Sequence, residues 1–460
     1  MSRFTLTVRG LRLGVVALAV LPLALAGCVG VESGPEQAAP PGGTPATAGG
    51  SAATTLAPSD PAAPVTLTWW TGQEAEAQKI LDGLAADFTT AHPNVTIKAA
   101  PGASTTDELL QKLLAGFTAK TYPDISYAFG SWASQLAQSE RTLDITADVA
   151  QPAAKWEEFP EAARKTAAPG ERTIGFPAVV DNLGLFYNKT VFDAAGVAYP
   201  TNDWTWDDFR AAAKKLTNPA KNIYGTAMAV NGGEDTTWHM WPQLWQNGGA
   251  ILTPDEKKAA FNSEAGVKAV SFWRDLAVTD KSVYLDQTGE KYAPLFASDN
   301  IGMMISGPWH LYDVKQAGTK YGVTRLPGTN GNHATVSGPD LWVLFDHQDA
   351  NRAYWAYQFG LWLTAAEQDE RWSMAIGNLP LRSAATSTPA FAKAVAEYPG
   401  YEVFADNLTN ATNKRPTVPG YIGLSEAYGT AVSRLLQGQG EVKAELDKAA
   451  AAADTALAGS

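Results

Sequence analysis

Two hydrophobic periodicities alternate near the start of the folded part of this chain, and this alternation constrains the fold more than any other feature of the sequence. Strand-like patterns occur over 65–70, 95–98 and 122–129, and apolar helical stripes separate them over 80–88 and 109–117. A strand–helix–strand–helix–strand order builds a mainly parallel sheet that is covered by helices. The sequence therefore predicts an α/β fold.

Ligands of open α/β sheets bind in the crevice beyond the carboxyl ends of the strands. In this chain the rule selects Trp69 and Trp70 at the end of the first predicted strand, and it selects Gly130, Ser131 and Trp132 after the third. The same residue types also serve in cores and turns. We expect these five residues to line the ligand cleft.

The amino-terminal segment has the pattern of an export signal. Three arginines precede an uncharged apolar run over 13–26, which is short for a membrane span, and the sequence Leu-Ala-Gly-Cys ends at Cys28, the only cysteine of the chain. A single cysteine excludes a disulfide within the chain. The stretch resembles a bacterial lipobox, so residues 1–27 are predicted to be a signal peptide and Cys28 a lipidated residue that anchors the protein to the cell membrane.

Residues 28–64 follow the signal peptide and are dominated by Gly, Ala, Pro, Ser and Thr. Such a composition cannot bury enough apolar surface to fold, so we interpret the segment as a disordered linker behind the lipidated cysteine. The remaining residues, 65–460, form a stretch that is long for one hydrophobic core. Two lobes are therefore expected.

Charge and motif content argue against several functions. The formal net charge is −12 at pH 7 and no basic run occurs, so nucleic acid is not an expected partner. The sequence contains no Gly-x-Ser-x-Gly elbow, no His-Glu-x-x-His and no phosphate loop, and its five histidines are scattered. We expect no catalysis, no metal and no cofactor. A secreted glycoside hydrolase stays open as an alternative, because a sequence does not show whether two carboxylates lie about 5–9 Å apart.

Several short motifs occur along the chain in the order and spacing of a known family. They are Leu67-Thr68-Trp69-Trp70-Thr71, His92-Pro93-Asn94-Val95, Tyr122-Pro123-Asp124-Ile125, Gly175-Phe176-Pro177, Thr205-Trp206-Asp207-Asp208-Phe209, Gly307-Pro308-Trp309, Gly377-Asn378-Leu379-Pro380-Leu381-Arg382 and Arg415-Pro416. Each motif alone is weak, but together they extend over about 67–449. On these motifs the chain resembles the extracellular solute-binding proteins of sugar importers, family 1, which include maltose-binding protein.

The resemblance implies a two-lobed fold of the type II periplasmic-binding class, with hinge-connected lobes and the ligand cleft between them. Carried over, residues 65–177 plus 338–378 form the first lobe, and 178–337 plus 379–460 form the second. The resemblance also implies that the chain captures a carbohydrate, which we expect to be a di- or oligosaccharide, outside the membrane. It would deliver this sugar to the permease subunits of an ABC importer, and we expect it to act as a monomer.

Aromatic residues are natural platforms for a sugar, because the C–H face of the ring packs on an aromatic plane while the hydroxyls need donors and acceptors. Trp238, Trp241 and Trp245 cluster beside polar residues. Trp309 follows Gly307-Pro308, where the family that the chain resembles often stacks an aromatic ring on the sugar. Tryptophan also serves commonly in cores. These four tryptophans are predicted ligand platforms.

Carboxylates that accept two neighbouring hydroxyls are strong sugar contacts. Asp181 and Asn182 follow the first crossover of the implied fold. Asp340 stands in Ser337-Gly338-Pro339-Asp340, where many relatives of the resembling family carry two glycines, and this departure alters either ligand choice or the hinge. The same residue types also suit turns. The predicted polar set is completed by Gln73, Asp107, Arg382 and Tyr421.

A non-sugar solute is the main alternative within the same fold, since binders of this architecture also hold peptides, polyamines, phosphate esters or iron. An anionic ligand would demand convergent Arg or Lys, and iron would demand clustered Tyr, His or carboxylates. Neither cluster is evident in the sequence, but distant segments can bring such residues together in space.

Overall fold

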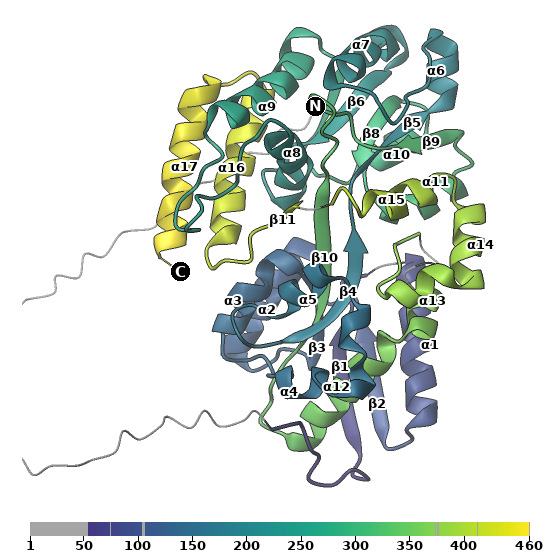
Figure 1. The fold of residues 1–460 in the computed structure, drawn as a ribbon, viewed down its shortest axis with the longest axis vertical. Helices are drawn as coiled ribbons and strands as arrows, with labels where there is room; N and C mark the ends of the chain where they lie inside the picture. Colours follow the sequence, from purple (N-terminus) through teal and green to yellow (C-terminus); the bar gives the residue numbers. More distant parts are fainter. Residues whose placement is uncertain are drawn as a thin grey trace, which may run out of the picture. The chain divides into compact units, whose positions relative to one another are not determined.

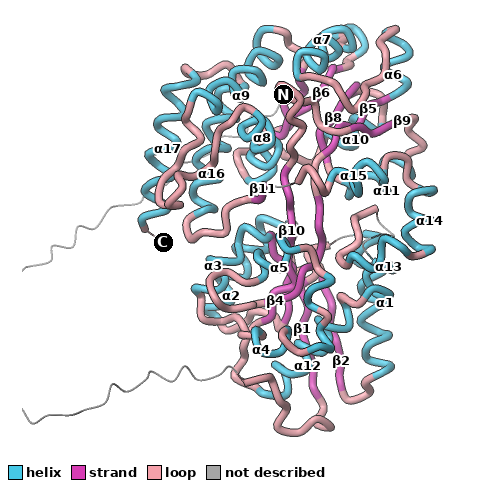
Figure 2. Tube along the Cα trace, viewed as in Figure 1, coloured by secondary structure: helices cyan, strands magenta, loops and turns pink. Residues whose placement is uncertain are grey.

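The computed structural model describes residues 54–73, 75–103, 106–372, 374, 377–411 and 413–459, without the side chains of residues 75, 76, 106 and 107. The predicted signal peptide, Cys28 and most of the predicted linker lie outside these residues. Within the described part, strands and helices alternate, and the strands form two separate sheets (Figure 1, Figure 2).

The first sheet contains the predicted amino-terminal unit. Its strands are β1 (Val65–Trp70), β2 (Val95–Ala100), β3 (Ile125–Phe129), β4 (Gly175–Asp181), β10 (Val336–Leu344) and β11 (Asn413–Lys414). β1 pairs in parallel with β2 and β3, whereas β10 is antiparallel to both β3 and β4 and parallel to β11. The helices α1 (Ala75–Ala91) and α2 (Thr106–Ala119) connect the first three strands. The predicted strand–helix–strand–helix–strand order is confirmed.

The second sheet runs in the order β7-β6-β8-β5-β9. Its strands are β5 (Gly184–Asn188), β6 (Tyr224–Ala229), β7 (Val283–Asp286), β8 (Ile301–Ser306) and β9 (Tyr321–Thr324). β6 is parallel to β7 and β8, and β5 is antiparallel to β8 and β9. Both sheets therefore mix a parallel centre with antiparallel strands, which suits crossovers between two lobes.

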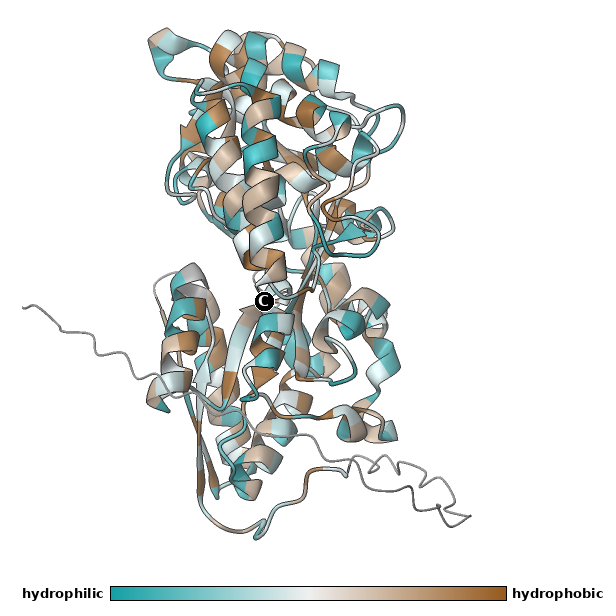
Figure 3. Ribbon diagram, turned by 90° about the vertical axis from the view of Figure 1, so that its left-hand side faces the viewer, coloured by the Kyte–Doolittle hydropathy of each residue, from teal (hydrophilic) through white to brown (hydrophobic). Residues whose placement is uncertain are grey.

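The longer helices cover the sheets or close the carboxyl-terminal region. They are α7 (Trp206–Leu216), α8 (Glu234–Gln246), α9 (Glu264–Arg274), α12 (Ala350–Leu363), α14 (Pro389–Glu397), α16 (Tyr421–Leu436) and α17 (Val442–Ala458). The shorter ones are α3 (Ala133–Gln138), α4 (Thr146–Val149), α5 (Glu161–Ala167), α6 (Lys189–Ala195), α10 (Tyr292–Ala297), α11 (Leu311–Gln316), α13 (Ala366–Trp372) and α15 (Tyr401–Asn407). In Figure 3 hydrophilic and hydrophobic residues alternate along the outer helices, as expected for helices with one buried face.

Local sequence explains where individual helices begin and end. Thr205 and Asp208 form a capping box at the start of α7, in which each side chain accepts a hydrogen bond from the other residue's backbone. Asn188 caps α6, and Gly196 ends it at φ 63°, a left-handed conformation that glycine adopts at little cost. No helix in the described part of the chain is long and apolar enough to span a lipid bilayer.

Each sheet buries its apolar residues in its own core. Trp69, Phe176 and Trp342 belong to the core of the first sheet, whereas Leu185 and Val336 belong to that of the second. β4 pairs within the first sheet as far as its last residue, and the chain enters the core of the second sheet after it. Along β10 the chain passes back, because Val336 packs in the core of the second sheet and Trp342 in that of the first. The predicted two-lobed α/β fold is confirmed, while the residue limits of the lobes stay a prediction.

Candidate ligand-binding site

A cavity of about 520 Å³ is lined by residues of both lobes, and its size suits a small ligand. Strands of the first sheet supply one wall, and the start of α8 and the turn after β8 supply the other. The lining residues are Gly72, Gln73, Tyr127, Phe129, Val179, Asp181, Asn231, Glu234, Asp235, Trp238, Thr288, Gly289, Glu290, Tyr292, Trp309, Gly338, Asp340, Asn378 and Arg415.

Strand register places two aspartates on the same face of the first sheet. β4 and β10 are antiparallel, with Asp181 opposite Gly338 and Val179 opposite Asp340. Side chains two residues apart on a strand point to the same face, and directly paired residues share that face. Asp181 and Asp340 therefore lie diagonally across the two strands and both line the cavity.

Arg415 joins carboxylates from two distant segments. Its Nη2 lies 3.1 Å from Asp340 Oδ1 and its Nη1 lies 3.1 Å from Glu234 Oε1. Asp340 also accepts hydrogen bonds from the Tyr127 hydroxyl at 2.6 Å and from the Gly130 backbone N–H at 3.0 Å. The guanidinium is 6% exposed, so this network connects the two lobes in a largely dry environment.

Glu234 completes the network on the side of the second lobe. Its carboxylate accepts hydrogen bonds from the Tyr421 hydroxyl at 3.1 Å and from Ser425 Oγ at 2.6 Å, both on α16. Glu234 is also the first residue of α8, where the partial positive charge of the helix end stabilises an anion. Tyr421 therefore supports the site through Glu234.

Burial dominates the protonation of the acids in this cavity. Burial raises the pKa of Asp181 well above its ordinary value, and the neighbouring Asp340 charge raises it further, against the opposing effect of Arg415. The pKa of Asp340 is also raised by burial, although Arg415 and the hydrogen bond from Tyr127 oppose the shift. The carboxyl group of Asp181 is thus harder to ionise than an exposed aspartate.

Two acceptor oxygens in the cavity have no protein donor. Asp181 is 7% exposed and Asn378 is 5% exposed, and the Oδ1 atom of each is buried without a hydrogen-bond partner among the described residues. Buried polar atoms in folded proteins are nearly always paired, because an unpaired one costs its full desolvation free energy. These two oxygens are positioned to accept hydrogen bonds from a ligand.

The aromatic residues of the cavity differ in how free their ring faces are. The Arg415 guanidinium lies 4.5 Å from the ring centroid of Trp238, and a Cβ at Gly338 would lie 2.3 Å from Cη2 of the same indole. Trp238 is therefore held between an arginine and a glycine. Trp309 is half-buried and its ring lies against Gly307, whose missing side chain makes room for it. Trp309 is the better platform for a ligand.

A family model described as bacterial extracellular solute-binding protein matches residues 83–400, which is more than half of the 460 residues. The chain belongs to this family. The resemblance drawn from the motifs is thereby confirmed. A solute-binding protein is a binding component of transport that works outside the cytoplasm and is not an enzyme, so the hydrolase alternative is excluded.

Individual relatives and a solved structure are similar to this chain over half or more of their own length. The sn-glycerol-3-phosphate-binding periplasmic protein UgpB of Rhizobium meliloti is 24% identical over 417 residues, covering 85% of this chain and 94% of that protein. A lipoprotein encoded near oleD in Streptomyces antibioticus is 27% identical over 262 residues, covering 56% of this chain and 50% of that protein. The crystal structure of the cyclic alpha-maltosyl-1,6-maltose binding protein of Arthrobacter globiformis superposes with a TM-score of 0.72 at 25% identity, covering 86% of this chain and 100% of that one.

Five of the residues predicted from the sequence line the cavity of this solute-binding protein. They are Gln73, Asp181, Trp238, Trp309 and Asp340. Gln73 follows β1, Asp181 ends β4, Asp340 lies within β10, Trp309 lies in the turn after β8, and Trp238 lies on α8. The strand-end rule selected none of these five residues, and ligand contact by them stays a prediction.

The residues predicted at the ends of β1 and β3 lie mostly elsewhere. Trp69 is fully buried, with its ring centroid 5.2 Å from that of Trp342. Trp70 is half-buried beneath the Lys112 ammonium, 4.4 Å away. Ser131 and Trp132 are buried and do not line the cavity. The sheet is covered on both faces, so strand-end side chains on either face pack inside the first lobe.

Four further predicted residues of the second lobe are structural in this arrangement. Asn182 is fully buried and donates to the Phe404 carbonyl at 2.9 Å. Trp241 stacks on Tyr428 with centroids 4.5 Å apart, and its Nε1 donates to the Tyr421 hydroxyl. Trp245 packs, half-buried, against the core of the second sheet. None of these residues, nor Tyr421 itself, lines the cavity.

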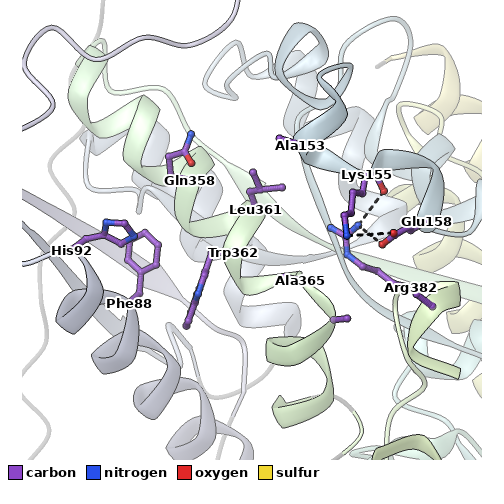
Figure 4. Close-up of a pocket in the computed structure, with 12 residues that line it drawn as sticks. Phe88, His92, Ala153, Lys155, Glu158, Gln358, Leu361, Trp362, Ala365 and Arg382 are labelled. Atoms are coloured by element: carbon purple, nitrogen blue, oxygen red, sulfur yellow. Dashed lines mark hydrogen bonds and ion pairs between the residues drawn. The ribbon is translucent and has the colours of Figure 1, made fainter. Parts of the chain in front are cut away.

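Arg382 lies in a different cavity of about 390 Å³, shown in Figure 4. Its Nε donates to the Thr364 carbonyl at 2.6 Å, and its Nη1 lies 3.3 Å from Glu158. The guanidinium also packs 4.0 Å from the ring centroid of Phe159. The structure thus gives Arg382 a structural position that ties its segment to the first lobe.

Two predicted residues lie outside what the structure describes, namely the side chain of Asp107 and all of Cys28. Within the described residues, no group of three or more His, Cys, Asp or Glu is placed to hold a metal ion. Sequence reasoning also missed cavity residues that the structure brings together: Tyr127, Phe129, Asn231, Glu234, Asp235, Thr288, Glu290, Tyr292, Asn378 and Arg415. Of these, Asn378 and Arg415 belong to two of the family motifs, Gly377 to Arg382 and Arg415-Pro416. The motifs therefore contain two cavity residues that were not predicted individually.

Proposed function

We propose that this solute-binding protein captures a carbohydrate, a di- or oligosaccharide, and delivers it to the permease of an ABC importer. One observation carries the proposal: the cavity combines the half-buried Trp309 ring with two buried acceptor oxygens that have no partner among the described residues. A saccharide has both complementary parts, an apolar ring face and several hydroxyl donors. The Arthrobacter protein, whose structure is named for a cyclic maltosyl-maltose, supports the same class.

The ligand named for the Rhizobium relative, glycerol phosphate, fits this cavity less well. A phosphate is an acceptor of hydrogen bonds and is recognised by convergent Arg, Lys or backbone N–H groups. Arg415 is the one cation among the described lining residues, and it is already paired with Glu234 and Asp340. A phosphate would also face Asp181 without a donor to offer. The cavity therefore favours a donor-rich polyol over an anion.

The proposed mechanism is closure of the two lobes on the sugar. Residues of both lobes line the cavity, so a saccharide that contacts both walls has higher affinity for the closed arrangement and shifts the equilibrium towards it. The network from Tyr127 through Asp340 and Arg415 to Glu234 lies between the lobes and would fix their register on closure. The closed surface would then dock on the permease.

Attachment to the membrane is part of the proposal. The lipobox-like sequence ending at Cys28 supports export, cleavage and lipidation, and a relative from Streptomyces antibioticus carries the name of a lipoprotein. The linker up to residue 64 would keep a monomeric binding unit close to its permease, which raises the effective concentration of loaded protein at the importer. Mass spectrometry of the membrane fraction tests this: an acylated amino-terminal Cys28 is expected, and a Cys28→Ser variant should be released into the medium.

The binding proposal is tested by thermal unfolding of the purified mature protein against mono-, di- and oligosaccharides. Peptides, spermidine and sn-glycerol 3-phosphate serve as controls. A ligand at about 100 times its dissociation constant adds roughly 2.7 kcal/mol to the free energy of unfolding. We expect a shift with one class of saccharide. A shift with a control and with no saccharide would refute the carbohydrate proposal while leaving the family membership intact.

A further inference from the structure

The cavity of the proposed saccharide site carries an excess of negative charge. Five carboxyl groups line it, against the single guanidinium of Arg415 among the described lining residues. That guanidinium lies 3.1 Å from both Glu234 and Asp340, so its charge and two of its donors are already engaged inside the network. The remaining carboxyl groups are not neutralised by Arg415.

Asp181 is the acid whose situation calls for a partner from outside the protein. It is 7% exposed, it lines the cavity, and its Oδ1 has no hydrogen-bond partner among the described residues. Burial raises the pKa of Asp181, and repulsion by the charge of Asp340 on the adjacent strand raises it further. A buried carboxylate is stable only when it is paired and hydrogen-bonded. The unpartnered Oδ1 of Asp181 therefore suits a hydrogen-bond donor that also carries positive charge.

The cavity offers Asp181 a further acceptor as its neighbour, while Arg415, the cation among the described lining residues, is engaged with Glu234 and Asp340. Asn378 presents a second unpartnered Oδ1 to the same cavity. The Tyr401 hydroxyl is engaged with the Asn378 backbone carbonyl at 2.8 Å, and the Tyr127 hydroxyl is engaged with Asp340 at 2.6 Å. Both neighbouring hydroxyls thus donate elsewhere, and the two free oxygens are left to the ligand.

Two functional groups of a saccharide can reach such oxygens, a hydroxyl and a protonated amine. A hydroxyl supplies one donor and no charge, and it also brings lone pairs that need donors of their own. An ammonium supplies three donors, no lone pair and the compensating charge, and its hydrogen bonds to a carboxylate are roughly twice as strong as those between neutral groups. The imbalance of charge and the two free acceptors both favour the ammonium.

We propose that the ligand is an amino saccharide whose protonated amine binds Asp181 and Asn378 while a sugar ring lies on Trp309. This inference rests on the proposed saccharide-binding function and narrows it to a class of substrate. It places the amine at the end of β4 and the ring at the turn after β8, so that ligand recognition uses one residue group from each lobe.

Matched ligands test the inference by isothermal titration calorimetry on the mature protein. The probes are glucose, glucosamine and N-acetylglucosamine, together with their β-1,4-linked dimers, so that each set differs only in a hydroxyl, an ammonium or a neutral amide. We expect the amine to bind at least about tenfold more tightly than the hydroxyl or the amide. In an Asp181→Asn variant that preference should fall to about threefold or less, while a Glu426→Gln variant, outside the cavity, retains it.

The outcomes separate this inference from the broader function. Equal or tighter binding of the hydroxyl or amide forms overturns the amine assignment and leaves saccharide binding in place. A preference for the amine that survives Asp181→Asn overturns the role of Asp181. Binding of spermidine without any saccharide overturns both the inference and the carbohydrate proposal, and so does the absence of binding by every saccharide of these sets and of the wider panel.

Discussion

Two cavities of this protein each contain a buried arginine, yet their buried polar groups differ in how fully they are hydrogen-bonded. In the cavity shown in Figure 4, Arg382 donates to backbone carbonyls and to Glu158, and its contacts all lie within one region of the fold. In the cavity between the lobes, Arg415 joins Glu234 to Asp340, but Asp181 and Asn378 keep acceptor oxygens without partners. The first cavity is satisfied by the protein itself, and the second is left incomplete.

This difference distinguishes a structural cavity from a binding cavity. Folding tends to pair most buried polar atoms, and some core atoms such as Trp69 Nε1 and Trp342 Nε1 are unpaired here as well, so the oxygens of Asp181 and Asn378 are distinguished by belonging to residues that line a cavity. Size does not separate the two cavities well, since they measure about 390 and 520 Å³. The cavities differ in whether their buried polar atoms have hydrogen-bond partners, and the following substitutions test this difference.

The largest expected effect concerns the two arginines. Arg415→Met leaves Glu234 and Asp340 buried without a counter-charge, so the free energy of unfolding should fall by about 3–5 kcal/mol. Arg382→Met removes hydrogen bonds to neutral carbonyls and a partner of Glu158, which is 32% exposed and can be solvated by water, so its cost should be smaller. Urea denaturation of both variants measures the difference. An equal loss would contradict the contrast between the cavities, and adding Asp340→Asn and Glu234→Gln to Arg415→Met should restore most of the stability.

The next effect concerns two half-buried tryptophans, Trp309 and Trp362, one in each cavity. Trp309→Ala removes the proposed ring platform, and we expect saccharide affinity to fall by about 2 kcal/mol or more, which is about thirtyfold. Trp362 lines the cavity of Figure 4 and packs near Phe88 and Phe359, so Trp362→Ala should lower stability but leave affinity unchanged. Calorimetric titration of both variants with the best saccharide measures this. A comparable loss of affinity in Trp362→Ala would mean that the wrong cavity was assigned.

A smaller effect is expected at the glycine that makes room for Trp238. In Gly338→Ala the new Cβ would lie 2.3 Å from Cη2 of the indole, so the ring and the guanidinium stacked on it must shift, at a cost of about 1–3 kcal/mol. Gly83→Ala on α1 is the matched control, since nothing lies within 4 Å of its added Cβ and helix propensity favours alanine. Unfolding and titration of both variants measure the result. An unchanged Gly338→Ala protein would show that Trp238 is not held in place by the strand.

The sequence predicted the architecture well because local periodicity determines it. The alternation in β1 and the helical stripe of α1 are properties of neighbouring residues, and they located the first sheet without any tertiary information. Periodicity did not say which strand-end residues face the cavity. Trp69 and Trp70 are both covered because helices pack on both faces of this sheet, and a purely local pattern does not reveal that covering.

Part of the site was predicted where it coincides with a chain crossover. Asp181 and Asp340 lie on the two strands that pair with each other where the chain passes between the lobes, and both were among the predicted residues. Glu234 and Arg415 were not, because their contact joins residues 181 positions apart and depends on how α8 meets the segment before α16. Pairing over such separations is a product of tertiary packing, and no spacing rule within the sequence encodes it.

The smallest expected effect is the pH dependence that Asp181 confers on stability. Its folded-state pKa is raised, so the folded protein holds this proton more strongly than the unfolded chain, whose aspartate has a pKa of about 3.9. Stability is therefore fully present below about pH 4 and is lost as pH rises through the raised pKa. Asp181→Asn carries no titrating group, so its stability relative to the parent should rise with pH across that window.

Asp447 provides the opposite case on the surface and serves as the control. Hydrogen bonds from Lys443 and Asn262 lower its pKa, so its contribution is present above the unfolded pKa and is lost as pH falls. Asp447→Asn should therefore lose stability relative to the parent at neutral pH and match it in acid, opposite in sign to Asp181→Asn. Thermal unfolding of the three proteins from about pH 2 to pH 9 without ligand makes the comparison. Parallel curves for Asp181→Asn and the parent would show that Asp181 is not buried as described, and an amine ligand would then have no unpaired charge to neutralise.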